Sequence, residues 1–159
     1  MEKDLNVSEL KISPAPPLAD MPNQQMKAML THWISVKGKA DVPNQNKIDP
    51  FAYPKESLPN ILIIEIEEET HRYKTRLAGT AVCEAFGINP TGQYISDAPH
   101  INHNATKRLD WCVTQRSHYL TTDNYTKRAL KPRKYKSLSL PYKNKKGEIS
   151  RILSTFMFD

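Results

Sequence analysis

The sequence predicts an α+β protein built on a five-stranded antiparallel sheet, with helices inserted between the second and third strands and an amphipathic helix before the first. Its 159 residues suit one domain, since domains commonly run to about 100–150 residues. Apolar residues recur with helical spacing in residues 24–37, 80–87 and 102–117, which predicts three helices. Strand-length apolar or alternating segments occupy 61–67, 71–78, 119–126, 134–142 and 149–158. Five strands with intervening helices are typical of a layered α+β fold.

The region before the first strand divides into three parts. Residues 1–22 are expected to form a proline-rich arm that resists helix and sheet and is either mobile or laid along a surface. Residues 23–38 form the first helix, with Asn23 as the N-cap and Gly38 as the C-terminal stop. Residues 39–60 are a connector punctuated by four prolines, and the core domain is expected over 61–159.

The first helix carries a single apolar stripe at i, i+3, i+4, i+7 and i+8. Its members are Met26, Met29, Leu30, Trp33 and Ile34. A stripe of this size must leave water, either on the sheet of its own chain or against the same helix of a second copy. The second destination is preferred because the outward Arg72, Lys74 and Arg76 make their strand a poor apolar support. The stripe is therefore predicted to be the dimer face of a homodimer.

The first two strands are expected to pair as a hairpin. Residues 61–67 are almost wholly branched and apolar at first, whereas 71–78 alternate cleanly. Tyr73, Thr75 and Leu77 would face inward. Near the end of the chain, Gly147 supplies the positive φ of a turn that joins the last two strands.

Several separated segments resemble one family. They are LPNILIIEI at 58–66, RYKTRLAGTA at 72–81 and FGINPTG at 86–92, together with Trp33, Ile48–Phe51 and Leu140-Pro141. In this order they resemble a bacterial stand-alone PAS-like family, formerly a domain of unknown function, over about residues 25–158. The resemblance implies a PAS fold and, from the flanking helices of PAS domains, pairing across a two-fold axis. It implies no established chemistry and no identified cofactor.

The resulting hypothesis is a sensory or interaction module without catalysis, which binds a small ligand or a separate signalling protein. A ligand would lie between the inner face of the sheet and the inserted helices. The candidate lining residues, chosen by strand alternation and helix face, are Tyr73, Leu77, Phe86, Leu109, Cys112, Val113, Leu138 and Leu140. The same residues could equally be the core of a domain with no cavity.

Motifs for catalysis and cofactors are absent from the sequence. It contains no G-x-S-x-G, G-x-x-x-x-G-K-[ST] or G-x-G-x-x-G. Cys83 and Cys112 lack the surroundings of the reactive cysteine of flavin photoreceptor PAS domains and are expected to be buried free thiols. His100 and His103 form an H-x-x-H without an adjacent third ligand, so no metal site is predicted. A haem-binding role for His103 or His118 is not favoured.

Positive charge is concentrated near the C-terminus. Residues 127–151 hold ten basic residues and one acid, a charge of +9 within a net charge of +6. An alternative function is therefore binding of nucleic acid or an anionic surface. Its candidate residues are Lys127, Arg128, Lys131, Arg133, Lys134, Lys136, Lys143, Lys145 and Lys146. Solvated strand lysines are the preferred interpretation, and nucleic-acid binding is not expected.

The expected location of the protein is the cytoplasm. No apolar run approaches the roughly 18–20 residues of a membrane span. The polar start of the chain is not followed by the apolar region of a signal peptide. Two cysteines are too few for a disulfide framework.

Overall fold

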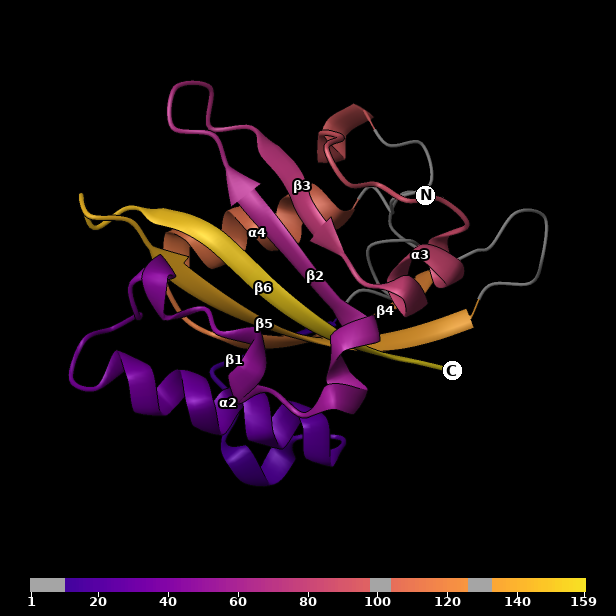
Figure 1. Cartoon of the computed structure of the whole chain (residues 1–159), viewed down its shortest axis with the longest axis horizontal. Helices are drawn as coiled ribbons and strands as arrows, with labels where there is room; N and C mark the ends of the chain where they lie inside the picture. The colour runs from indigo at the N-terminus through magenta and orange to yellow at the C-terminus, as the bar shows by residue number, and fades with distance from the viewer. Residues whose placement is uncertain (1–10, 98–103, 126–132) are drawn as a thin grey trace.

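A computed structural model describes residues 11–97, 104–125 and 133–159. A six-stranded antiparallel sheet lies between helix α2 on one face and helices α3 and α4 on the other (Figure 1). Its strand order is β1-β4-β5-β6-β2-β3. The strands are β1 Lys11–Pro14, β2 Ile61–Ile66, β3 Tyr73–Ala78, β4 Tyr119–Tyr125, β5 Arg133–Lys143 and β6 Ile149–Phe158. The helices are α2 Gln24–Lys37, α3 Thr80–Phe86 and α4 Asn104–Gln115, with short 3-10 turns η1 Leu18–Asp20, η2 Gln45–Lys47, η3 Pro50–Ala52, η4 Lys55–Asn60 and η5 Ile95–Asp97.

The predicted α+β fold is confirmed, and the helices enter between the second and third of the five predicted strands. The sixth strand, β1, comes from the N-terminal arm and pairs with β4 from Lys11↔Thr122 to Pro14↔Tyr119. The expectation that this arm resists sheet structure is therefore wrong for Lys11–Pro14. Because β1 is an edge strand with one free side, the missing N–H of Pro14 is tolerated there.

Helix α2 has the predicted bounds and caps. The side chain of Asn23 accepts a hydrogen bond from the backbone N–H of Met26 at 2.8 Å, and Gly38 ends the helix at φ 56°. The prediction that its apolar stripe forms a dimer face needs correction, because the stripe packs on the sheet of its own chain. Met26, Met29, Leu30 and Trp33 are at most 2% exposed, while Ile34 is 39% exposed.

Helix α2 avoids the basic side chains of β3 by lying over β5. The indole Nε1 of Trp33 donates a hydrogen bond to the carbonyl of Pro141 at 2.9 Å, and both groups are buried. The sheet face beneath the helix offers Leu138 and Leu140, which are fully buried. The basic surface of β3 is unsuitable for the stripe, but the apolar surface that buries it lies three strands away, on β5.

The β2–β3 hairpin is present, but its alternation is interrupted. Ile63 pairs with Leu77, whereas the next residue, Ile64, pairs with Thr75, so Arg76 is an extra residue in β3. Such a bulge exchanges the two faces of the strand on either side of it. Thr75 is accordingly buried and Leu77 is 46% exposed, so the inward placement of Leu77 was wrong.

Gly79 is required where β3 passes into α3. A Cβ atom at this position would lie 2.3 Å from the carbonyl oxygen of Pro59 in η4. The N–H of Gly79 also donates to the carbonyl of Ile61 at 2.8 Å. This close approach fixes α3 against the start of β2, beside the end of β6.

Candidate ligand site

The structure divides the eight predicted pocket residues among four places. Close to α4, Leu109 and Cys112 are buried, with Tyr73 and Val113 packed partly against them. Phe86 belongs to a second apolar cluster, and Leu77 lies at the surface. Leu138 and Leu140 lie on the opposite face of the sheet. The eight residues therefore do not line one cavity.

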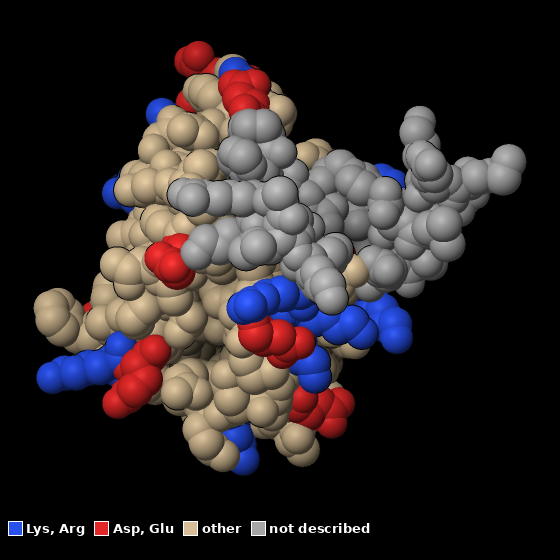
Figure 2. Space-filling model, turned by 90° about the vertical axis from the view of Figure 1, so that its right-hand side faces the viewer, with Lys and Arg blue, Asp and Glu red and all other residues tan. Residues whose placement is uncertain are grey.

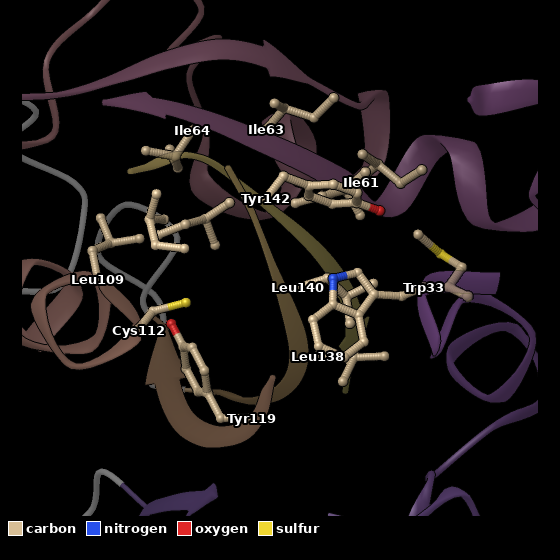
Figure 3. Packing of buried hydrophobic residues seen from close by; sticks show 14 of the residues in the cluster. Trp33, Ile61, Ile63, Ile64, Leu109, Cys112, Tyr119, Leu138, Leu140 and Tyr142 are labelled. Carbon is tan, nitrogen blue, oxygen red and sulfur yellow. The ribbon is translucent and has the colours of Figure 1, made fainter. Parts of the chain in front are cut away.

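Strand pairing explains the position of Leu138 and Leu140. Tyr119 lies beneath α4 and pairs with Ser139, so Ser139 faces α4 and its neighbours in β5 face the other way. Figure 3 shows Leu138 and Leu140 on the same side of the strands as Trp33, with Cys112 and Tyr119 on the other. The prediction that these two leucines face the inserted helices is wrong.

The half of the inner face beneath α4 is filled by side chains. Leu109, Cys112 and Tyr119 pack toward Ile64 of β2 (Figure 3), and each is at most 7% exposed. Burial raises the pKa of the Cys112 thiol far above its usual range, which keeps it protonated and unreactive. At the edge of this group the hydroxyl of Tyr73 donates to Asp110 at 2.5 Å. This half has the character of a core.

The other half of the inner face is an aromatic cluster. Phe86 of α3 meets Tyr125, Phe156 and Phe158 edge-on, with ring centroids 6.1–6.3 Å apart. Phe156 and Phe158 stack with parallel rings at 5.3 Å. Tyr135 completes the cluster, and burial raises its pKa to about 12, so its hydroxyl stays neutral.

A hollow of about 570 Å³ opens beside this aromatic cluster. It lies where β6 continues beyond the first residue of β2, since Ile61 pairs with Thr155 and β6 runs on to Phe158. The lining residues come from the start of α2, from η4, from α3 and from the ends of three strands. They are Asn23, Gln25, Ser57, Asn60, Ala81, Glu84, Ala85, Tyr125, Arg133, Thr155, Phe156, Met157, Phe158 and Asp159. None of these residues was predicted to line a ligand pocket, and Arg133 was named only as a candidate for nucleic-acid binding. The hollow depends on where two strands stop pairing, which the sequence does not reveal.

A buried ion pair separates the two halves of the inner face. Nη1 of Arg108 in α4 lies 2.9 Å from a carboxylate oxygen of Asp123 in β4, and the Asp123 side chain is 2% exposed. The Arg108 guanidinium also lies 5.9 Å from the ring centroid of Tyr135. This pair therefore ties α4 to the sheet at the border of the aromatic cluster.

The basic candidate residues that the structure describes fall into two groups at opposite ends of β5. Lys127, Arg128 and Lys131 lie outside the described residues. Of the others, Arg133, Lys134 and Lys136 are at the start of β5, and Lys143, Lys145 and Lys146 are at or beyond its end. Six residues of β5, 137–142, separate Lys136 from Lys143, which at about 3.3 Å per residue places the two groups roughly 23 Å apart along the strand.

Carboxylates also interrupt the positive charge. Lys146 forms an ion pair with Glu68, one of the glutamates beside the β5–β6 turn. On the face shown in Figure 2, blue and red side chains lie next to one another. Carboxylates therefore offset part of the positive charge among the basic residues that the structure describes.

The remaining chemical groups offer no metal or haem site in the part of the chain that the structure describes. No cluster of three histidine, cysteine or acidic side chains is present there, and His100 and His103 fall outside it. The Nε2 atom of His118 already forms a hydrogen bond with the backbone carbonyl oxygen of Pro16, at a distance of 2.9 Å. Cys83 is a half-buried free thiol rather than a fully buried one. Within the same limits, no helix is long and apolar enough to cross a membrane.

Comparisons with known proteins agree with this architecture. The family model described as PAS domain matches residues 21–157. An RNA-binding Light-Oxygen-Voltage receptor aligns with a TM-score of 0.52 at 10% identity over 94% of this chain and 38% of that one. A variant of Vivid (VVD) aligns with a TM-score of 0.50 at 10% identity over 81% and 98%. A Light-Oxygen-Voltage domain studied with a flavin analogue aligns with a TM-score of 0.50 at 8% identity, over 66% of this chain and 80% of that one. No curated protein matches the sequence.

Proposed function

The chain belongs to the PAS domain family, and from that premise we propose that it is a sensory module that binds a small planar ligand and performs no catalysis. The observation that carries the proposal is the hollow beside the aromatic cluster. Its volume of about 570 Å³ lies within the roughly 300–1,000 Å³ of small-molecule sites. The space beneath α4, by contrast, is occupied by side chains.

The lining of the hollow favours a flat ligand with polar substituents. The parallel rings of Phe156 and Phe158 offer an aromatic wall, and Tyr125 stands at the same end of the sheet. Arg133 and the amides of Asn23 and Asn60 supply polar groups around it. Aromatic surfaces with a few directed polar groups bind planar molecules by stacking and orient them by hydrogen bonds.

The same lining supports binding rather than catalysis. Around the described part of the hollow there is no histidine or cysteine, the side chains most often used for proton transfer and nucleophilic attack near neutral pH. The hydroxyl of Ser57 donates to the carbonyl of Pro54 at 2.5 Å, so its proton is already engaged by the backbone.

Native mass spectrometry of the freshly purified full chain tests the proposal. We expect a retained small molecule, or binding of planar heterocycles from a screen. Ala85→Trp would fill the hollow and should abolish binding, and Phe158→Ala should weaken it. Leu77→Ala, on the exposed surface, is the matched control and should bind like the wild type. Binding that survives Ala85→Trp in full, or no binding at all, would overturn the proposal.

We also propose where the module acts and what it contacts. The module is cytoplasmic, as its two free thiols suggest, and passes its signal to a separate protein. A homodimer would have to use surfaces other than the buried α2 stripe, and light scattering at tens of micromolar tests it. Nucleic acid is not a partner: we expect no binding tighter than the non-specific range of about 10⁻⁴–10⁻⁶ M at physiological salt.

A further inference from the structure

The N-terminal strand β1 is joined to the rest of the molecule by a strained hinge. Ala15 adopts φ 42°, in the left-handed region that a residue with a Cβ rarely occupies. Pro16 and Pro17 follow and have no backbone N–H to donate. Four residues of β1 pair with β4, and Ile12 packs partly against the core. The strand is therefore held in place by a small set of contacts.

His118 supplies two of the contacts that hold this hinge. Its backbone carbonyl accepts a hydrogen bond from the N–H of Ala15 at 2.9 Å. Its ring Nε2 lies 2.9 Å from the carbonyl oxygen of Pro16. Because a carbonyl can only accept, Nε2 carries the proton in this contact. The ring also lies against Trp33 of α2, with centroids 5.3 Å apart, so arm, helix and sheet meet at one side chain.

The surroundings of the His118 ring oppose a positive charge. From α2 it faces Lys37, whose Nζ lies 5.9 Å from the ring centroid of Trp33. From the arm it faces the backbone of Pro16, and next to it in β4 is the buried Tyr119. Among the described residues no carboxylate acts on the ring. Burial is the main cause that lowers the pKa of His118, and Lys37 lowers it further, while the bond to Pro16 acts in the opposite direction.

We propose that His118 is a pH-sensitive clasp, which releases β1 and its hinge from the edge of β4 when its ring takes up a proton from solvent. In the closed arrangement the ring is half-buried and uncharged. In the open arrangement the imidazolium is hydrated and Ala15 leaves its strained conformation. Release exposes the unpaired N–H and C=O groups along β4, a surface that can accept another strand.

The direction of the pH dependence follows from linkage. The closed arrangement disfavours protonation, so it is most stable above the ordinary histidine pKa of about 6.5. As the pH falls below that value, the population of the open arrangement rises, because the open arrangement binds the proton more readily than the closed one. A single proton allows at most about a tenfold increase in opening per pH unit.

Amide hydrogen exchange of the full chain between pH 5 and 8 tests the clasp, after correction for intrinsic exchange rates. We expect Ala15 and the β1 amides to lose protection below about pH 6.5 by up to tenfold per unit, while β6 amides keep theirs. His118→Gln retains a donor without titrating, so its arm should exchange independently of pH. His71→Gln, in the exposed β2–β3 turn, is the control and should behave like the wild type.

A second measurement needs no variant. An NMR titration of the His118 ring in the wild-type chain should give a midpoint below the ordinary histidine value of about 6.5. The inference is overturned if that midpoint is at or above the ordinary value, if the slope persists in His118→Gln, or if β1 and β6 lose protection together, which would be global unfolding.

Discussion

The two faces of the sheet are covered by helices in different ways. On the α2 face one 14-residue helix buries a continuous apolar layer, in which Trp33, Leu138, Leu140 and Tyr142 are at most 2% exposed. On the opposite face two helices cover separate clusters, and the buried Arg108–Asp123 pair lies at the border between them. The first face is closed by apolar packing and by the buried hydrogen bond from Trp33 to Pro141. The second keeps a polar group in its middle and a hollow at one end.

This difference indicates that one face of the sheet mainly stabilises the fold, whereas the other has room for a ligand. A continuous apolar layer stabilises the fold and leaves no room for a ligand. An interrupted layer is less efficient as a core, yet its aromatic end presents rings and polar groups beside an open volume. Departures from uniform packing are the places where function is most often located. Two sets of variants test whether the two faces differ in this way, and a third tests a contact that lies outside both.

The largest expected effect is the loss of the buried ion pair. Asp123→Asn leaves the Arg108 guanidinium buried without its counter-charge, which should lower the free energy of unfolding by about 3–5 kcal/mol. The matched control is Asp97→Asn, because the Arg72–Asp97 pair has similar length, 3.0 Å, but is exposed. Asp97→Asn should lower the free energy of unfolding by at most about 1 kcal/mol. Equal effects in urea unfolding would show that the inner face is not held together at this pair.

The next expected effect distinguishes buried from exposed leucines. Leu140→Ala removes a fully buried side chain from the α2 face and should cost about 2–5 kcal/mol. Leu77→Ala removes a side chain that the bulge leaves 46% exposed, and should cost about 0.5 kcal/mol or less. Urea unfolding of both variants measures the difference. A larger loss for Leu77→Ala than for Leu140→Ala would contradict the assigned facing of both strands.

The smallest expected effect concerns a tie outside both faces. Nε of Arg116, which follows α4, lies 2.7 Å from Asp41 of the connector, and Nη1 donates to the carbonyl of Gly147. The bond to Arg116 lowers the pKa of Asp41. The stabilisation is therefore present above the usual carboxyl range and is lost as pH falls through and below it.

For Asp41→Asn we expect a loss below about 1 kcal/mol at neutral pH, because the pair is partly exposed. The thermal unfolding temperatures of variant and wild type should draw together as the pH falls below the ordinary aspartate pKa of about 3.9. Curves that stay parallel over the whole acid range would show that this carboxylate contributes no pH-dependent stability.

Local patterns in the sequence were sufficient for helices α2, α3 and α4 and for strands β2 to β6, but not for β1, which lies in a segment predicted to resist sheet structure. The apolar spacing and the caps Asn23 and Gly38 predicted α2, and clean alternation predicted the β2–β3 hairpin. Alternation failed at Leu77, because a bulge at Arg76 depends on the partner strand and leaves no mark in the strand's own pattern.

Alternation also failed to say which face of β5 meets which helix. Both faces of this strand are buried, so Ser139 is as inaccessible as Leu140, and its hydroxyl is paired with that of Ser154 at 2.7 Å. A rule that places leucine inside and serine outside cannot distinguish the two faces of a strand that is buried on both. The Arg108–Asp123 pair and the hollow arise from contacts between distant segments, which no spacing in the sequence predicts.

The central claim is that ligands enter the open, aromatic end of the inner face and not the filled end beneath α4. NMR mapping of a bound planar heterocycle on the full chain tests it most directly. We expect chemical-shift changes and ligand contacts at Ala85, Tyr125 and Phe158, with Leu109 and Cys112 unaffected. Contacts that gather at Leu109 and Cys112, with Phe158 unchanged, would contradict the account.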